Sequence, residues 1–157
     1  MENRILRLSD AGFVVRQCAV DEIIPLRHRI LRSGLPIEEA HFEGDLQPDT
    51  AHVAAFLESN NSAMCCATMV NECYETKPAW KLRGMATDAA WQSRGLGNAV
   101  LQYLIDLVKS QSDIRLFWCN ARIGALEFYK RQGWTIESEI FDIPTAGLHY
   151  RMKLDLQ

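Results

Sequence analysis

The chain has 157 residues, of which 48% are hydrophobic and 24% are charged, and its formal net charge is −3 at pH 7. This length fits one domain, residues 1–157, whose core buries roughly two-thirds of the surface that the unfolded chain exposes. The acidic balance gives no reason to expect a nucleic-acid partner, because such binding usually shows a basic patch. No stretch approaches the roughly 20 apolar residues that cross a bilayer, and the charged N-terminus is unlike a secretory signal. We therefore expect a cytoplasmic protein without a membrane partner.

The cysteines predict reduced thiols rather than disulfides or a metal site. They are an odd set without a Cys-x-x-Cys pair, and two of them are adjacent within an apolar run. In a cytosolic compartment such residues behave as small buried hydrophobes. The positions are Cys18, Cys65, Cys66, Cys73 and Cys119.

In chain order, the N-terminal half predicts three strands and a helix. Phe13–Cys18 is rich in β-branched and aromatic residues, which favour a first strand. A helix is expected to begin at Asp21, because apolar residues then recur at helical spacing and Pro25 is tolerated only in the first turn. The acidic connection Ile37–Asp49 either holds a short helix or lines a site. A hairpin follows, with strands at His52–Leu57 and Ala63–Val70.

The C-terminal half predicts four strands and two helices. Trp80–Thr87 is the fourth strand, and Gly84 in its interior predicts a bulge or a close backbone approach. Asn98–Lys109 carries one apolar stripe, and Ala121–Arg131 ends before Gly133, a natural C-cap. The remaining strands are Asp113–Asn120, Trp134–Phe141 and Leu148–Leu154. Because strand, helix and strand in succession imply a parallel crossover, the sequence predicts an α/β (α+β) domain with a mixed sheet and flanking helices.

The stretch Gln92–Gly97, which reads Gln-Ser-Arg-Gly-Leu-Gly, opens the helix after the fourth strand. Small residues let a ligand approach the backbone, and the free N–H groups of a first helical turn favour phosphate. A Walker loop would require Lys-Ser/Thr where this chain has Asn98-Ala99, and the dinucleotide fingerprint would require a third glycine. By itself the stretch favours a plain strand-to-helix turn, and a nucleotide-binding module is an alternative.

The order of elements and these residues together resemble the GNAT superfamily of N-acetyltransferases. The turn pattern of that family, Gln/Arg-x-x-Gly-x-Gly/Ala, is matched by Gln92, Gly95 and Gly97. The other matching segments are Leu82–Thr87, Asn120–Arg122, Ala125, Phe128–Tyr129 and Gly133–Trp134. The resemblance implies a mixed, mostly antiparallel central sheet of about seven strands with a splayed fourth/fifth strand pair.

The resemblance further implies acetyl-CoA as cosubstrate and no metal. The backbone N–H groups of Ser93–Asn98 would hold the pyrophosphate, while Arg94 either contacts a phosphate or points into solvent. The Gly84 bulge would admit the pantetheine arm between the splayed strands. The implied cofactor contacts are Met85, Thr87, Gln92, Ser93, Arg94, Gly95, Leu96, Gly97, Asn98, Asn120, Ala125 and Phe128.

Tyr129 is the candidate general acid. Transfer from a thioester to an amine expels a thiolate, and a thiol pKa of about 8.5 lies below the tyrosine pKa of about 10, so a neutral phenol persists at pH 7 and can donate to the sulfur. The alternative is an ordinary aromatic residue on an amphipathic helix. Cys119 lacks an evident histidine partner, which favours direct attack by the amine over a covalent acyl-enzyme.

His149 is the candidate base, because histidine titrates between about pH 5 and 8. Arg83 and Glu43 are the candidate acceptor-binding residues, with Arg83 suited to a carboxylate. The other candidate bases are Glu43, Asp45, His41 and His52. The acidic connection hints at a cationic acceptor, although a solvated acidic face gives the same pattern.

The sequence thus predicts an acyl-CoA-dependent N-acetyltransferase that acts on a primary amine of a small molecule or a protein. The alternative is a catalytically inactive, coenzyme A-binding regulatory protein of the same fold. The sequence leaves the oligomeric state open, with a homodimer as the common soluble assembly.

Overall fold

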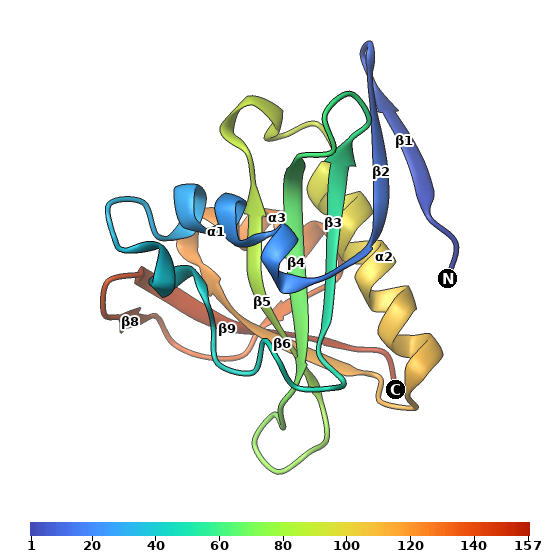
Figure 1. Cartoon of the computed structure of the whole chain (residues 1–157). Helices are drawn as coiled ribbons and strands as arrows, with labels where there is room; N and C mark the ends of the chain where they lie inside the picture. The colour runs from blue at the N-terminus through green and yellow to red at the C-terminus, as the bar shows by residue number, and fades with distance from the viewer.

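A nine-stranded sheet with helices on both faces forms the architecture of the computed structural model, which describes residues 1–157 (Figure 1). The strands are β1 (Arg4–Leu8), β2 (Ala11–Cys18), β3 (Ala51–Leu57), β4 (Ala63–Asn71), β5 (Trp80–Thr87), β6 (Leu116–Arg122), β7 (Thr135–Ile136), β8 (Phe141–Ile143) and β9 (Gly147–Asp155). The α-helices are α1 (Ile24–Leu31), α2 (Leu96–Gln111) and α3 (Leu126–Arg131). Single 3-10 turns lie at Val20–Glu22, Ile37–Ala40, Ala89–Trp91 and Ile123–Ala125.

The strand order confirms the mixed, mostly antiparallel sheet. The order is β1-β2-β3-β4-β5-β6-β9-β7, and β8 pairs with β9 outside this path. Only β5 and β6 are parallel, since α2 connects them as the crossover helix. All other pairs are antiparallel and follow short connections or the return of β9.

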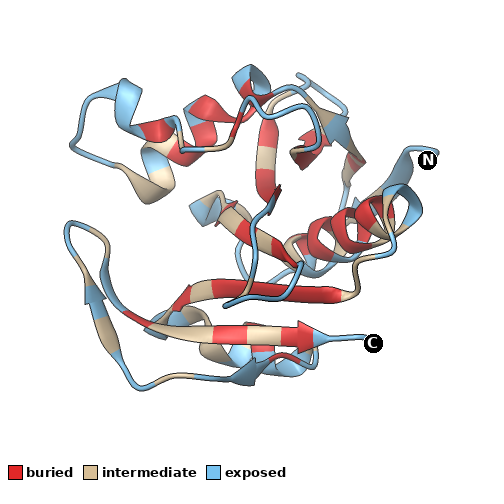
Figure 2. Ribbon diagram, turned by 90° about the horizontal axis from the view of Figure 1, so that it is seen from below, coloured by how far each residue is buried: buried red, intermediate tan, exposed pale blue.

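Alternation along the central strands divides the core between the two faces of the sheet. Val53 and Ala55 on β3 pack in the larger cluster, which includes the apolar stripe of α2, whereas Ala54 and Phe56 pack with α1. Thus α1 and α2 cover opposite faces. The buried residues gather on the central strands and on the sheet-facing side of α2 (Figure 2). None of the helices is both long and apolar enough to cross a membrane.

Three differences from the predicted elements have a clear physical reason. The strand β1 was not predicted, because it is a short, mostly exposed edge strand in which two of the five residues are charged. The predicted strand Trp134–Phe141 is two short strands, β7 and β8, separated by an irregular segment. The predicted helix Ala121–Arg131 begins late, because β6 continues to Arg122 by pairing with β9, and a 3-10 turn intervenes before α3.

The predicted irregularity at Gly84 is a β-bulge in β5. Cys66 pairs with Ala86 and Thr68 pairs with Arg83, so β5 carries one residue more than β4 across this interval. Gly84 has φ +62°, a conformation that L side chains rarely adopt, and a Cβ there would lie 3.0 Å from Arg27 Nε. Glycine is therefore required both for the bend and for the close approach of Arg27.

The bulge lies just beyond the point at which β5 and β6 stop pairing. The two strands pair only over Trp80–Leu82 and Phe117–Cys119, although both continue further. Beyond these residues β5 stays bound to β4, and β6 stays bound to β9. The predicted splay of this strand pair is thus present, and it opens a gap in the middle of the sheet.

We predict that Gly84→Ala destabilises the protein more than Gly34→Ala does. Both glycines have positive φ, which costs an alanine about 1–2 kcal/mol. A Cβ at Gly84 also meets Arg27 and Phe42, whereas nothing lies within 4 Å of one at Gly34. Urea unfolding should therefore show a further loss of about 1 kcal/mol or more for Gly84→Ala. Equal losses for the two variants would show that crowding at the bulge contributes nothing.

Candidate active site

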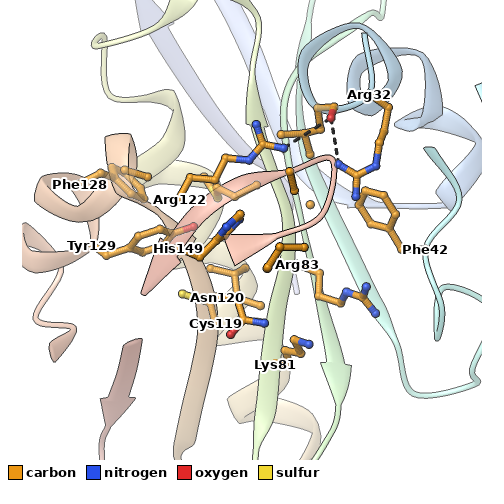
Figure 3. Close-up of a pocket in the computed structure, with 17 residues that line it drawn as sticks. Arg32, Phe42, Lys81, Arg83, Cys119, Asn120, Arg122, Phe128, Tyr129 and His149 are labelled. Carbon is orange, nitrogen blue, oxygen red and sulfur yellow. Dashed lines mark hydrogen bonds between the residues drawn. The ribbon is translucent and has the colours of Figure 1, made fainter. Parts of the chain in front are cut away.

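A pocket of about 240 Å³ lies where β5 and β6 part, and α1, α3 and the β8–β9 hairpin supply its other walls (Figure 3). Among the 17 residues that line it are the following predicted site residues: Arg83, Met85, Asn120, Ala125, Phe128, Tyr129 and His149. These residues come from four separate elements and from a 3-10 turn. The fold therefore brings together in this pocket seven of the sixteen site residues that the sequence predicted.

The gap lets side chains from opposite faces of the sheet line one pocket. Tyr129 belongs to the larger core cluster, on the face that α2 covers, together with Cys119 and Met152. His149 on β9 and Asn120 on β6 alternate with members of that cluster and so point to the other face. In an unbroken sheet the backbone would separate the two sets.

The N-terminus of α2 supplies backbone donors close to this pocket. Gly95 is the N-cap in a left-handed conformation with φ 91°, and no side chain caps the helix. Ser93, with φ 61°, shapes the turn before it. The first N–H groups of a helix have no partner within the helix. This turn therefore presents free donors at the positive end of a 16-residue helix, which is a favourable arrangement for an anion.

Gly97 packs the turn against the pocket wall. A Cβ at this position would lie 3.2 Å from Phe128 and 3.4 Å from Met85, both of which line the pocket. The predicted turn residues differ in exposure. Leu96 is fully buried and offers only its backbone, whereas Gln92, Ser93, Arg94 and Asn98 are exposed.

Two other predicted cofactor contacts lie at the edges of this region. The Arg94 guanidinium lies over the Trp91 ring, 5.1 Å from its centroid. Thr87, at the end of β5, pairs with Cys65 and accepts a hydrogen bond from Gln92 Nε2 at its carbonyl oxygen. Neither residue lines the pocket, and both lie beside the turn.

Asn120 carries a polar atom that the protein leaves unpaired. Its Oδ1 is buried without a hydrogen-bond partner, and the residue lines the pocket. A buried acceptor without a partner costs about 1–3 kcal/mol. An amide N–H in the pocket would satisfy it, so Asn120 fits the amide-rich arm of coenzyme A.

Tyr129 extends from α3 into the pocket and is only 5% exposed. Its ring packs between Phe128 and Trp134, at centroid distances of 5.1 and 5.4 Å. Burial raises the pKa of the phenol well above its ordinary value. The hydroxyl therefore stays protonated at neutral pH and can act as a donor.

His149 is held in one tautomer by the backbone. Its Nδ1 lies 2.7 Å from the Gly147 carbonyl oxygen, and a carbonyl can only accept, so Nδ1 carries the proton. In the neutral ring Nε2 then has a free lone pair. The ring is 4% exposed and stacks on Phe141, with centroids 6.1 Å apart. His149 is thus a fixed proton acceptor that lines the pocket.

The other candidate bases do not line the pocket. His41 and Glu43 are exposed, while Asp45 and His52 are buried in a separate network. Glu43 contributes only its carbonyl oxygen, which accepts a hydrogen bond of 2.9 Å from Arg83. The structure therefore places the Glu43 carboxylate outside the site. Of the five bases that the sequence suggested, only His149 lines the pocket.

Cys119 lies in the pocket wall but is poorly suited to nucleophilic attack. Burial raises the pKa of its thiol, and the charge of Lys81 offsets this effect only in part. A thiol that stays protonated is a weak nucleophile. Cys119 therefore offers no evident route to a covalent acyl-enzyme, and direct attack by the amine remains the expectation.

Residues 20–134 match the model of the acetyltransferase (GNAT) family. The chain belongs to this family. The predicted N-acetyltransferase family and GNAT fold are thereby confirmed.

The sequence of this GNAT protein is 28% identical over 139 residues to the uncharacterized N-acetyltransferase YitI of Bacillus subtilis (strain 168), which covers 88% of this chain and 93% of the relative. Solved structures share its fold at low identity. Escherichia coli ElaA has a TM-score of 0.71 at 12% identity, covering 90% of this chain and 98% of that one. An aminoglycoside 6'-N-acetyltransferase complexed with coenzyme A has a TM-score of 0.70 at 13% identity, covering 90% and 96%.

Arg32, Phe42 and Arg122 are among the pocket residues of this GNAT protein that the sequence did not nominate as site residues. Arg32 follows α1 and Phe42 lies in the acidic connection, far along the chain from the glycine turn. No local pattern marks either residue as functional. Arg122 belongs to the segment Asn120–Arg122 that resembles the GNAT family, but no role was assigned to its side chain.

A buried network behind the Gly84 bulge supports this wall. Arg27, which is 0% exposed, donates to both carboxylate oxygens of Asp45 at 2.7 and 3.0 Å and to Thr68 Oγ1 at 2.8 Å. His52 Nε2 donates to the Asp45 carbonyl at 3.0 Å, so its neutral Nδ1 accepts from Thr68 at 2.7 Å. The network thus requires a neutral His52.

The environment of this network sets the ionisation of its members. Burial lowers the pKa of His52, and the charge of Arg27 acts in the same direction. Burial opposes the ionisation of Asp45, but hydrogen bonds from Arg27 and from the Phe42 N–H outweigh it and lower the pKa of that carboxyl. The ionised carboxylate of Asp45 and the neutral ring of His52, which are the forms present at pH 7, therefore stabilise the folded state.

We predict that the free energy of unfolding falls as the pH drops below about 6.5, the ordinary histidine pKa. Below this value the unfolded state binds a proton at residue 52 that the folded state resists, because the folded pKa is lowered. A second loss should follow below about pH 4, as Asp45 is forced to accept a proton.

Urea unfolding between pH 7 and pH 5 measures the first of these losses. His52→Gln should remove most of the pH dependence in this interval, whereas His41→Gln, at an exposed histidine, should retain it. A His52→Gln profile that parallels the wild type would contradict the assignment.

Proposed function

We propose that this protein transfers an acetyl group from acetyl-CoA to a primary amine by direct attack, with Tyr129 as hydrogen-bond donor to the leaving sulfur and His149 as base. The observation that carries the proposal is the convergence of these groups on one pocket. The unpaired Asn120 oxygen, the Tyr129 side chain and the His149 ring line the pocket where β5 and β6 part, and the free donors of the α2 turn lie beside it.

The turn before α2 and the gap between β5 and β6 fit the two halves of acetyl-CoA, its pyrophosphate and its pantetheine arm. The N–H groups of Leu96–Asn98 suit the pyrophosphate, because no side chain caps this helix end. Within the gap, Met85 lies in the bulge of β5 and Asn120 on β6, so both flank an inserted arm. Acetyl-CoA supplies the activated carbonyl and a thiolate leaving group when it is bound.

His149 would take the proton that the attacking amine must lose. An alkylammonium has a pKa of about 10.4, so only about one molecule in a few thousand is a free amine at pH 7. His149 offers its Nε2 lone pair, because Nδ1 is committed to Gly147. The free amine that results then forms the new C–N bond. Its nitrogen sheds a second proton as the C–S bond breaks, which balances the proton that the thiolate takes up.

Tyr129 would assist the departure of sulfur as the C–S bond breaks. Its raised pKa keeps the hydroxyl protonated, and a buried donor stabilises developing negative charge strongly. A phenol is a weaker acid than a thiol, so the hydrogen bond contributes more than a completed proton transfer does. Below about pH 8.5 the released thiolate then takes a proton, and the phenol is retained.

The inactive coenzyme A-binding alternative explains less of this pocket. Simple binding requires the turn and the arm contacts but neither a protonated phenol nor an oriented histidine. We propose that the enzyme acts in the cytoplasm on a small molecule or on a protein amine, with a homodimer as the expected assembly. The test of catalysis is thiol release from acetyl-CoA with a panel of amines, alongside calorimetry of acetyl-CoA binding. Binding without release for any amine would favour the inactive alternative.

We predict that Tyr129→Phe lowers kcat by about 100-fold, with the KM for acetyl-CoA within about twofold of the wild type. The variant removes one hydroxyl and keeps the packing against Phe128 and Trp134. Tyr103→Phe is the matched control, since Tyr103 is also buried but lies on α2 away from the pocket. Steady-state thiol release measures both, and a Tyr129→Phe enzyme within twofold of the parent would remove the assigned role.

We predict that His149→Gln lowers kcat/KM by about 100-fold at pH 7 and that the loss shrinks as the pH rises toward the amine pKa of about 10. At high pH the acceptor is already a free amine, so a base contributes less. His41→Gln, at an exposed histidine, should retain the wild-type profile. A loss that stays constant from pH 7 to pH 10 would indicate a structural role instead.

A further inference from the structure

The end of the pocket opposite α3 is strongly basic. Its lining includes Arg32, Lys81, Arg83 and Arg122, and none of the 17 lining residues is acidic. The chain as a whole has more acidic than basic residues, 20 against 17. The charge of the pocket is therefore opposite to that of the molecule.

The three arginines lack carboxylate partners. Arg32 donates to the Leu31 carbonyl oxygen at 2.9 Å, and Arg83 donates to the Glu43 carbonyl oxygen at 2.9 Å. Eight of the 17 lysine and arginine side chains form ion pairs with carboxylates, among them Arg27 with Asp45, Arg29 with Asp88 and Lys81 with Glu72. Of the nine that form none, the three pocket arginines are the ones that line the pocket.

Arg32 and Arg122 are held next to each other in spite of their like charge. Arg122 donates to the same Leu31 carbonyl oxygen, at 3.5 Å, that accepts from Arg32 (Figure 3). Burial lowers the pKa of Arg32, and the charge of Arg122 lowers it further. Two adjacent, partly buried cations repel each other, and an anion between them would relieve this repulsion.

The Phe42 ring contacts two of the three pocket arginines, Arg32 and Arg83. The guanidinium carbons of Arg32 and Arg83 lie 4.8 and 5.6 Å from the centroid of its ring. The face of an aromatic ring attracts a cation but carries no net charge. It therefore orients the guanidinium groups without neutralising them.

The basic end adjoins the proposed base. Arg122 on β6 stands directly opposite His149 on β9 in the antiparallel register. Side chains at such positions have Cβ atoms about 4.5–5.5 Å apart. A ligand that places an anionic group on Arg122 would therefore have its adjacent atoms beside His149.

The phosphates of coenzyme A do not explain these arginines. The turn at the N-terminus of α2, which would hold these phosphates, contacts the pocket wall through Gly97, which packs on Phe128 and Met85. Figure 3 shows Phe128 and Tyr129 on the α3 side of the pocket and Arg32 and Phe42 on the α1 side. Arg32 and Phe42 thus lie across the pocket from the proposed thioester position, where an acceptor must enter, and Arg122 reaches from β6 to the Leu31 carbonyl oxygen beside Arg32.

We propose that the acceptor is an amine that also carries a carboxylate, which Arg32, Arg83 and Arg122 bind while the amine faces His149. The amine group of this acceptor rests on the proposed function, whereas its carboxylate is inferred from the pocket arginines alone. Planar guanidinium groups match a carboxylate in a bidentate fashion. A polycationic acceptor, which the acidic connection suggested from sequence, would instead meet like charge.

A binding experiment tests the anion without requiring catalysis. The probes are N-acetylated ω-amino acids of increasing chain length and their carboxamides, titrated calorimetrically into the complex of the protein with coenzyme A. The carboxylates should bind at least about tenfold more tightly than the matched amides. Equal affinities across the series would overturn the proposal.

Variants identify the groups that hold the carboxylate. Arg32→Gln and Arg122→Gln should each remove most of the preference for carboxylate over amide. Arg131→Gln, at an exposed arginine on α3, should preserve it. A preference that survives in both pocket variants would overturn the assignment. Inorganic phosphate is the second probe, and displacement of the carboxylates by phosphate at equal concentration would overturn the choice of carboxylate over phosphate.

A turnover experiment separates this inference from the proposed function. Thiol release is measured with the free ω-amino acids and their carboxamides as acceptors. The amino acids should show a kcat/KM at least about tenfold higher, expressed mainly in KM, with the difference lost in Arg122→Gln. Release that is equal or faster with the amides would overturn the carboxylate preference and leave the transferase intact. Carboxylate-selective binding without release from any acceptor would overturn the transferase and support the anion site.

Discussion

The feature on which the rest of this structure depends is the early end of pairing between β5 and β6. Two parallel strands in the middle of a sheet normally satisfy each other's backbone groups along their whole length. Here they pair over three residues each, from Trp80 and from Phe117, and then diverge while β4 and β9 hold their outer edges. The inner edges of both strands are left available to a ligand. A ligand that offers amide groups can pair with such edges, as an added strand would.

The divergence has an identifiable cause on the β5 side. Gly84 adds a residue to the strand in a conformation that other residues avoid, and the space left by its missing side chain is closed by Arg27. A buried guanidinium is costly unless it is paired, and here Asp45 and Thr68 pair it. The Nε atom of Arg27, next to the bulge, is buried without a hydrogen-bond partner. The close approach of Arg27 to Gly84 thus leaves one donor of the guanidinium unsatisfied. Catalytic geometry and a buried ion pair are thus coupled through one glycine.

Sequence reasoning found the parts of the site that are defined by local spacing. The turn Gln92–Gly97, the bulge at Gly84 and Tyr129 on α3 each follow from a short pattern of residues, because one strand or helix positions them. At the acceptor end the sequence suggested only Arg83 as a residue suited to a carboxylate, because Arg32, Phe42 and Arg122 join it only through tertiary packing of α1, the acidic connection and β6. The acidic connection misled for the same reason. Asp45 turns inward to Arg27, whereas Glu43 points away and leaves only its carbonyl at the site.

The gap also explains how one small pocket can serve both steps of acyl transfer. Tyr129 approaches from the face of the sheet that α2 covers, and His149 approaches from the face of α1. In the tetrahedral intermediate the incoming nitrogen and the departing sulfur are separate substituents of one carbon, so a donor for the sulfur and an acceptor for the amine would occupy different positions around it. A continuous sheet would keep these side chains apart, whereas a sheet opened at β5 and β6 lets each reach the carbonyl from its own face. The basic end then lies on the side of His149, so the charge that would orient the acceptor and the base that would activate it share one wall.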